Sequence, residues 1–476
     1  MQFSLTAGIA LFGLIPVALL LGALLPIRKA LAIILIGGWL LLPNRMGLSI
    51  PGFLDYTKIT AVSTSLMLVG LAFGIGDLLR YRWSWCDLPV AALCLVPIGS
   101  ALSNDLGIYE GLSGAAQQVL TWGIPYLFGR VYFNDVKACR ILAVGIVIGG
   151  LAYVPLCLFE MRMSPQLHRL LYGIHAERFS TAYRLGGYRP MVFLSHGIEL
   201  GLFMACASLA ACWLWRTRSV PKVLNLTIGW AALVILGTTV LCRSLGALVL
   251  LLTLLGALGL LWRWRTSPAL VLFMVAPLLY VGLRLSNVVE LEGAAALFSG
   301  IDKERADSLK ARFEGEEALI ASTWQRPWLG WCGSGRGREY NEEGRAVTAV
   351  DGLWIVTFGQ NGFLGLIPLM LALSLPGLLL YQRLGARGWL RPEYAPVTVL
   401  AMVTALYAMD CTMNAMQNLI YHLALGSVTT FALRVGAREE GRTAWADGGL
   451  AGKRPAPPVT RAPARACAIS SGVFTE

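Results

Sequence analysis

Arginines in the polar segments of this chain are the residues whose type best fits a defined chemistry. A guanidinium group stays charged and presents fixed donors to two oxygens at once, which suits phosphate. Arg243 lies between two apolar runs, where an unpaired arginine costs about 3 kcal/mol. The sequence therefore predicts a cationic, phosphate-binding site that is formed by Arg184, Arg189, Arg243 and Arg312. Two other interpretations stay open for these arginines: snorkelling to the membrane interface, and binding of anionic lipid headgroups without catalysis.

Two further residues are candidates for proton transfer. His196 falls in the first turns of an apolar run, close to Glu199, and Asp351 comes just before another apolar run. Either His196 or Asp351 could act as a general base if its surroundings adjust its pKa. Each also has a structural interpretation: His196 as a hydrogen-bonded interhelical histidine, and Asp351 as an N-cap. Glu199, inside an apolar run, must face protein or a cavity and could pair with an arginine.

Glycines and cysteines give weaker signals. The segment GWCGSGRGREY at 330–340 has no expected strand before it, so it indicates a tight turn or an anion-binding backbone nest rather than a nucleotide loop. The ten cysteines form no Cys-x-x-Cys pair and have no histidine at metal-ligand spacing. We therefore expect no metal and no cofactor.

The elements that must position these side chains are membrane helices. Of the 476 residues, 56% are hydrophobic and 14% are charged, against about a quarter charged in soluble domains. Apolar runs of about 17 to 25 residues recur along the chain. We count about thirteen of them, at 4–25, 30–43, 59–76, 88–103, 114–132, 141–159, 190–215, 223–241, 245–262, 268–284, 352–381, 395–412 and 418–434. The predicted fold is an all-α, polytopic membrane bundle of about 12–13 transmembrane helices with a large, partly helical outer loop.

The positions of lysine and arginine predict the orientation. Alternate short loops carry most of the basic residues, including Arg80, Arg140, Arg216 and Arg263, and such loops are typically cytoplasmic. The formal charge of +12 then reflects membrane orientation, so nucleic acid is not needed to explain it. An odd number of spans would place the N-terminus outside, although the exact count and this side stay open.

This topology predicts four regions. Residues 1–284 form the N-terminal membrane helices with an outer loop at about 160–189, and 285–351 form the large outer, periplasmic loop. Within that loop, 303–324 has apolar residues at helical spacing, among them Leu319 and Trp324. Residues 352–435 form the C-terminal membrane helices. The tail at 436–476, rich in Pro, Ala and Arg, is expected to be cytoplasmic and disordered.

The order of several motifs resembles the O-antigen ligase and polysaccharide polymerase family. The resemblance covers about residues 180–380. It is carried by Gly186–Pro190 (GGYRP), Cys242-Arg243-Ser244, Arg312, a P-x-x-G-x-x-G-x-G stretch at Pro327, Gly330, Gly333 and Gly335, and the polar Asp351 ahead of Gly362-x-x-Gly365. Ligases of this family have a His-Asn/Ser/Gln pair where this chain has Asp351-Gly352. This departure favours a polymerase or an exopolysaccharide variant over ligation to lipid A core.

The resemblance implies a metal-independent glycosyltransferase of the GT-C type in the bacterial inner membrane. Such an enzyme takes glycan from a polyprenyl-diphosphate-linked donor at the outer face. By position, Arg243, Arg312 and Arg189 or Arg184 would hold the diphosphate, and Asp351 would be the base, with His196 ranked second. The implied partners are the lipid-linked donor, a glycan or lipid acceptor and membrane lipids, and could include a chain-length regulator or other envelope assembly proteins.

Two other classes of protein stay open. A transporter or flippase of lipid-linked saccharide would need charges that line a path through the membrane, and the predicted span interiors hold few. A scaffolding subunit of an envelope complex would leave the outer arginines without a role.

Overall fold

The computed structural model describes residues 4–49, 54–175, 182–184, 186–286, 303–333, 335–338, 340 and 350–448, with the side chains of 303–309 and 436–448 left out. The chain divides into a compact unit, Met1–Arg434, and a C-terminal unit, Val435–Glu476. The elements below belong to the first unit, except for the end of the last helix.

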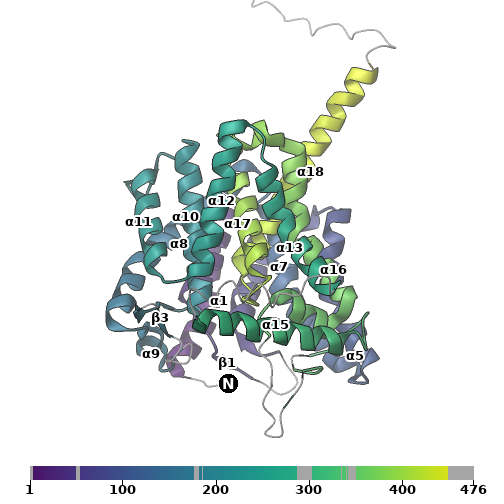
Figure 1. Ribbon diagram of the computed structural model, residues 1–476. Coiled ribbons are helices and arrows are strands. Elements are labelled where there is room, and N and C mark those ends of the chain that lie inside the picture. The colour runs from purple at the N-terminus through teal and green to yellow at the C-terminus, as the bar shows by residue number, and fades with distance from the viewer. Residues whose placement is uncertain are drawn as a thin grey trace, which may run out of the picture. The chain divides into compact units, whose positions relative to one another are not determined.

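Helices dominate the described fold, and its strands are two residues long (Figure 1). Those before the first predicted outer loop are α1 (Leu5–Leu24), α2 (Ile27–Leu41), α3 (Lys58–Phe73), α4 (Ile75–Leu79), α5 (Leu88–Ser103), α6 (Gly107–Gln118), α7 (Ile124–Tyr132) and α8 (Val136–Met163). Those after it are α10 (Gly197–Arg216), α11 (Ile228–Leu241), α12 (Leu245–Trp264), α13 (Pro268–Leu285), α15 (Lys303–Thr323), α16 (Leu353–Trp389), α17 (Ala395–Asp410) and α18 (Leu419–Gly448), with the short α9 (Leu167–Tyr172) inside that loop.

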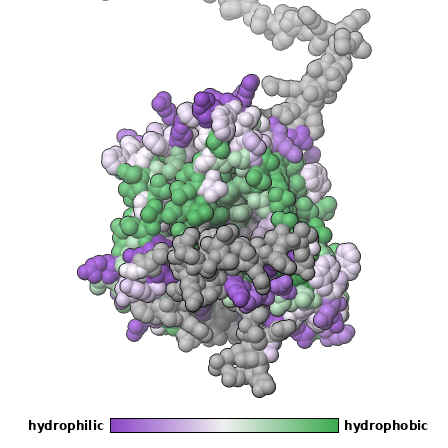
Figure 2. Space-filling view, in the orientation of Figure 1, coloured by the Kyte–Doolittle hydropathy of each residue, from purple (hydrophilic) through white to green (hydrophobic). Residues whose placement is uncertain are grey.

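The predicted fold class is confirmed: the protein is an all-α, polytopic membrane helix bundle. Seven of the described helices are long and apolar enough to cross a membrane, and α3, α11, α17 and the first part of α18 are shorter apolar helices. Large apolar side chains point outward from them, as Leu95 and Leu233 do. Figure 2 shows the resulting apolar band with polar surface above and below it, which is the pattern expected of a protein surrounded by lipid.

Short antiparallel ribbons close some of the connections between helices. They pair β1 (Gly47–Leu48) with β2 (Tyr56–Thr57), β3 (Tyr183–Arg184) with β4 (Gly187–Tyr188), and β5 (Lys222–Val223) with β6 (Leu226–Thr227). A π-helical turn, Val119–Gly123, lies between α6 and α7. A bundle with such irregular turns can still satisfy its backbone because neighbouring helices cover them.

Helices α10 and α17 form the centre of the bundle. Nearly every residue of α17 is buried, and α10 is buried along most of its length among α8, α11, α12 and α17. Small residues such as Ala205, Ala207 and Ala210 let these helices approach closely, as is common between membrane helices. The central place of α10 fixes the position of its N-terminus, where His196 and Glu199 lie.

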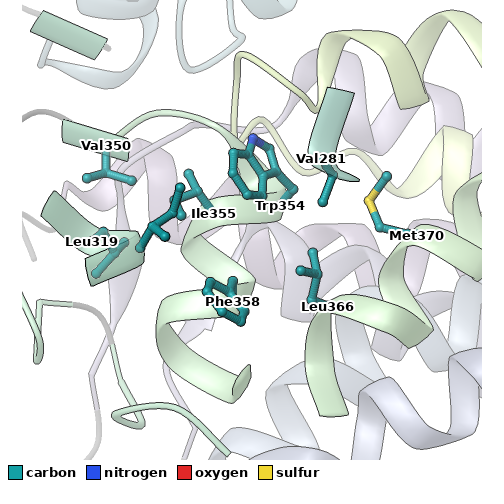
Figure 3. Close-up of a cluster of buried hydrophobic side chains, with 9 residues drawn as sticks. Val281, Leu319, Val350, Trp354, Ile355, Phe358, Leu366 and Met370 are labelled. Carbon is teal, nitrogen blue, oxygen red and sulfur yellow. The ribbon is translucent and has the colours of Figure 1, made fainter. Parts of the chain in front are cut away.

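The helix expected in the predicted outer loop is α15, which lies across one end of the bundle, the end at which β3 and α9 also lie (Figure 1). We call this end the α15 end. Leu319 and Ile320 of α15 join a buried cluster with Trp354, Ile355 and Phe358 of α16 (Figure 3). This packing fixes α15 against the start of α16 because a buried side chain of this size contributes about 1.5–3 kcal/mol.

Two sequence expectations about helices differ from the structure. Trp324, expected on the apolar face at 303–324, follows the last residue of α15 and is 50% exposed, with its ring edge against Phe358 and Phe363. Helix α18 continues to Gly448, so the start of the tail expected to be disordered is helical. Alanines and charged residues such as Arg438 and Glu440 sustain a helix there, whereas the Pro-rich part lies outside the described residues.

Candidate functional site

Three of the predicted arginines come together at the β3–β4 ribbon. Arg184 ends β3, and Arg243 lies in the turn between α11 and α12. Nη1 of Arg243 donates to the backbone oxygen of Arg184 at 2.9 Å. A β-carbon on Gly187 would lie 2.0 Å from the same Nη1, so the glycine gives the guanidinium room to rest on the ribbon backbone. The ribbon therefore holds Arg243 beside Arg184.

Arg189, directly after β4, is the buried member of this arginine cluster. Its Nη2 donates to Oγ of Ser244 at 3.0 Å, and its Nε has no hydrogen-bond acceptor among the described residues. Burial, and then the positive charge of Arg184, lower the pKa of Arg189 to about 10. The group is still charged at neutral pH, so an anion that accepted from Nε would offset its desolvation.

Glycines of α10 make this packing feasible. A β-carbon on Gly197 would lie 2.6 Å from Cδ and Nε of Arg189, and one on Gly201 would lie 2.2 Å from Cβ of Ser244. The first turns of α10 therefore contact the arginine cluster directly. This brings His196, the residue before α10, into the same region as Arg189.

His196 is the N-cap of α10. Its Nδ1 accepts a hydrogen bond from the backbone N–H of Ile198 at 3.0 Å. A neutral imidazole with an accepting Nδ1 carries its proton on Nε2. His196 can therefore donate from Nε2, and it would have to give up its cap to accept a proton on Nδ1.

Glu199 is a buried hydrogen-bond acceptor. It accepts from Nε1 of Trp39 at 3.1 Å and from the backbone N–H of Ser195 at 2.9 Å, and the hydroxyl of Ser195 also donates to it. It thereby ties the entry of α10 to α2. The proposed pairing of Glu199 with an arginine is not among the ion pairs of the described residues.

Arg312 and Asp351 form an ion pair between α15 and the residues that lead into α16. Nη2 of Arg312, on α15, lies 3.2 Å from Oδ2 of Asp351, and Nη1 donates to the backbone oxygen of Met413 at 3.4 Å. The N-cap interpretation of Asp351 is wrong, because α16 begins at Leu353 and has Gly352 as its N-cap. The Asp351 side chain is 47% exposed, so it is accessible as well as paired.

The segment between α17 and α18, residues 411–418, links this pair to α10. Met413 accepts from Arg312, and Sδ of Met416 lies 3.6 Å from the hydroxyl oxygen of Ser195. Asp410, the last residue of α17, is within electrostatic range of both Arg312 and Glu199. The Arg312–Asp351 pair and the entry of α10, which packs against Arg189, therefore both contact this segment.

A buried ion pair that is absent from the sequence predictions supports α15. Nε of Arg284, near the end of α13, lies 2.9 Å from Oε2 of Glu316, and both side chains are buried. The hydroxyl of Tyr280 donates to the same carboxylate at 2.9 Å, and Nη2 of Arg284 donates to the oxygen of Phe313 at 3.1 Å. An arginine at the end of an apolar run is the signal that singled out Arg243, and it could have identified Arg284 too.

The alternating glycines form a compact turn after α15. Gly330, Gly333, Gly335 and Gly337 have φ values of 65°, 81°, 103° and 76°, a region that favours glycine. The N–H of Trp331 donates to the oxygen of Gly359 at 2.9 Å, so the turn is anchored to α16. Within the described part of the chain, no group of three His, Cys, Asp or Glu side chains could hold a metal ion.

Comparison with known proteins adds no relative. No family model and no curated protein matches this chain. Function must therefore be inferred from the geometry of the α15 end and from the motifs of the sequence.

Proposed function

We propose that the protein is a membrane glycosyltransferase that polymerises or ligates glycan from a polyprenyl-diphosphate-linked donor. The resemblance to O-antigen ligases and polysaccharide polymerases suggests this activity. In this proposal the chain lies in a bacterial inner membrane with its C-terminus in the cytoplasm, and the α15 end faces outward.

The observation that carries the proposal is the packing of Arg184, Arg189 and Arg243 around one short ribbon. Three guanidinium groups at one ribbon give this region several positively charged donors, which suits an anionic ligand. A diphosphate offers several oxygens for charge-assisted hydrogen bonds, including one to the unpartnered Nε of Arg189. Arg312, across segment 411–418, would contact the same ligand.

The reaction is a single displacement. The acceptor hydroxyl attacks the anomeric carbon of the donor, a new glycosidic C–O bond forms, and the C–O bond to the diphosphate breaks. Negative charge grows on the leaving polyprenyl diphosphate, and guanidinium groups that contact its oxygens would stabilise that charge. The hydroxyl proton passes to a protein base.

Asp351 is the better base of the two candidates. Its carboxylate is partly exposed and its partner Arg312 is a proposed donor ligand, so the donor's arrival would free the carboxylate. His196 has its Nδ1 occupied by the backbone of α10. We assign His196 a hydrogen-bonding role. Its Nε2–H would donate to an oxygen of the lipid-linked glycan or of the glycan acceptor.

The decisive experiment uses the purified full-length chain in phospholipid nanodiscs with a polyprenyl-diphosphate-linked glycan as substrate. We expect release of polyprenyl diphosphate and transfer of the glycan, and the same rate when EDTA is present. A variant with Arg189→Gln and Arg243→Gln should lose this activity. Intact donor after incubation with the wild-type protein and an acceptor would overturn the proposal.

The competing transporter or flippase predicts a different result in proteoliposomes. It would move labelled donor across the bilayer without breaking the bond to diphosphate. In cells, gel analysis of surface polysaccharide in a deletion strain separates the two enzymatic variants. Loss of a polymerase leaves single repeats, and loss of a ligase leaves no attached glycan.

A further inference from the structure

The end of the bundle opposite α15 has a cavity of its own. It has a volume of about 430 Å³, lies between the C-terminal end of α10 and the start of α11, and is lined by Trp215, Arg216, Arg218 and Pro221, with Ile228 and Gly229 behind them. Helix α12 runs from beside Arg243 to Trp264, so its 20 residues separate this cavity from the arginine cluster by about 30 Å. The cavity is therefore distinct from the proposed active site.

The cavity is strongly cationic. Arg216 and Arg218 line it, Lys222 lies in β5, and Arg263 and Arg265 lie at the C-terminal end of α12. From residue 200 to residue 289 the sequence contains no Asp or Glu. The ion pairs of the described residues include none of these five basic residues. A counter-charge for them must therefore come from elsewhere.

Exposed tryptophans place the cavity at the level of lipid headgroups. Trp215, Trp230, Trp262 and Trp264 are all about half exposed or more, and tryptophan gathers at membrane interfaces. The Arg216 guanidinium lies 4.0 Å from the centre of the Trp262 ring, which fixes it at the end of α12. Exposed Leu233 continues the surface from the cavity along α11 toward the apolar band.

We propose that this cavity binds the headgroup of an anionic glycerophospholipid of the adjacent leaflet. Arg216 and Arg218 would bind the phosphodiester, and the acyl chains would lie against α11 beside Trp230 and Leu233. The phosphate supplies the counter-charge that the segment 200–289 lacks. A zwitterionic lipid carries its own cation near the phosphate and satisfies this site less well. The proposal does not depend on the glycosyltransferase activity.

The test measures lipid retained by the purified full-length chain. The protein is reconstituted in nanodiscs of phosphatidylcholine with an equal share of phosphatidylglycerol, extracted in mild detergent and examined by native mass spectrometry. We expect phosphatidylglycerol to be retained at least tenfold over phosphatidylcholine. The Arg216→Gln/Arg218→Gln variant should lose this preference, whereas the matched Arg263→Gln/Arg265→Gln variant, with exposed arginines outside the cavity, should keep most of it.

Equal retention of the two lipids, or an unchanged preference in the Arg216→Gln/Arg218→Gln variant, would overturn the proposal. Displacement of phosphatidylglycerol by millimolar inorganic phosphate would also overturn the proposal, because the site would then bind a soluble anion and not a lipid headgroup. Should the double variant fail to fold by circular dichroism and size exclusion, Arg218→Gln alone is the deciding variant. Arg218 is exposed in the turn after α10. The Arg218→Gln substitution should lower the preference for phosphatidylglycerol over phosphatidylcholine at least threefold.

Discussion

Arg312 reaches from α15 to the residue just ahead of the start of α16, and its Nη2 lies 3.2 Å from Oδ2 of Asp351. The two side chains are 24% and 47% exposed. Ion pairs this open to solvent contribute about 0–1 kcal/mol. Breaking the Arg312–Asp351 pair therefore costs little free energy. A phosphate that bound Arg312 could replace Asp351 as its partner and leave the carboxylate free.

The first prediction concerns Asp351→Asn. If Asp351 accepts the hydroxyl proton, the amide should lower kcat for glycan transfer by about 10²–10⁴-fold, the usual contribution of a general base. The KM for the donor should change little, because the amide keeps the shape of the carboxylate. Turnover of a polyprenyl-diphosphate-linked glycan by the purified protein measures both constants.

The matched control for Asp351→Asn is Glu314→Gln. Glu314 lies two residues from Arg312 on α15, and its exposed carboxylate is 3.8 Å from Nζ of Lys310. Removing this charge should leave kcat and KM within about twofold, since exposed helix pairs contribute a few tenths of a kcal/mol. A fall in kcat equal to that of Asp351→Asn would mean that general loss of negative charge on this face is responsible.

The second prediction concerns Gly187→Ala. The new methyl group would lie 2.0 Å from Nη1 of Arg243, so the guanidinium must leave the ribbon. Losing one charge-assisted contact of about 1.5–3 kcal/mol should raise the donor Kd by about 10- to 100-fold. Binding of a labelled polyprenyl-diphosphate-linked glycan to the purified variant measures this change.

Gly246→Ala is the control for the Gly187 variant. A β-carbon on Gly246, in α12, meets nothing within 4 Å. Alanine should leave the donor Kd unchanged and stabilise the helix by up to about 1 kcal/mol. Donor affinity in Gly187→Ala equal to that of the wild type would show that Arg243 is not a donor ligand.

Local patterns in the sequence predict the membrane helices, whereas the contacts that build the site depend on distant segments. An apolar run fixes a span because lipid forces its backbone into a helix. An arginine between two apolar runs, at position 243, likewise predicts phosphate binding. Nothing near Arg243 in the sequence indicates that Gly187 would provide its resting surface. Asp351 resembles an N-cap by position, yet the N–H of Leu353 donates to the oxygen of Cys411 in the distant segment 411–418.

The third prediction concerns the buried pair that holds α15. Glu316→Gln would leave the Arg284 guanidinium buried without its counter-charge, and breaking such a pair costs about 3–5 kcal/mol. The thermal midpoint in detergent should fall, and trypsin should cleave α15 faster. Glu314→Gln, which disturbs an exposed pair on the same helix and removes no trypsin site, should change neither.

A second variant separates charge from shape at this pair. The Arg284→Gln/Glu316→Gln protein keeps polar side chains at both positions and an acceptor for the hydroxyl of Tyr280, but it buries no charge. It should recover more than half of the midpoint lost in Glu316→Gln. A double variant as unstable as the single one would show that packing, and not charge pairing, holds α15.

The fourth prediction is a pH dependence that arises from His168 in α9. Nε2 of His168 accepts from the backbone N–H of Asn44 at 3.0 Å, so Nδ1 carries the proton and donates to the oxygen of Ile174 at 2.7 Å. Burial is the main cause that lowers the pKa of His168 below its ordinary value of 6.5, and the charges of Lys58 and His175 lower it further. The folded protein therefore resists protonation of this ring more than the unfolded chain does.

The sign of the effect follows from this lowered pKa. Well above pH 6.5 the His168 ring is neutral in both the folded and the unfolded protein, so its titration does not lower the free energy of unfolding. As the pH falls below 6.5, His168 becomes protonated in the unfolded chain but stays neutral in the folded protein. The free energy of unfolding therefore decreases until the pH passes the pKa of His168 in the folded protein. Thermal midpoints of the wild type between pH 8 and pH 5 should fall. They should fall less in His168→Asn, whose amide can still donate to Ile174 but does not titrate, and parallel curves for the two proteins would contradict the assignment.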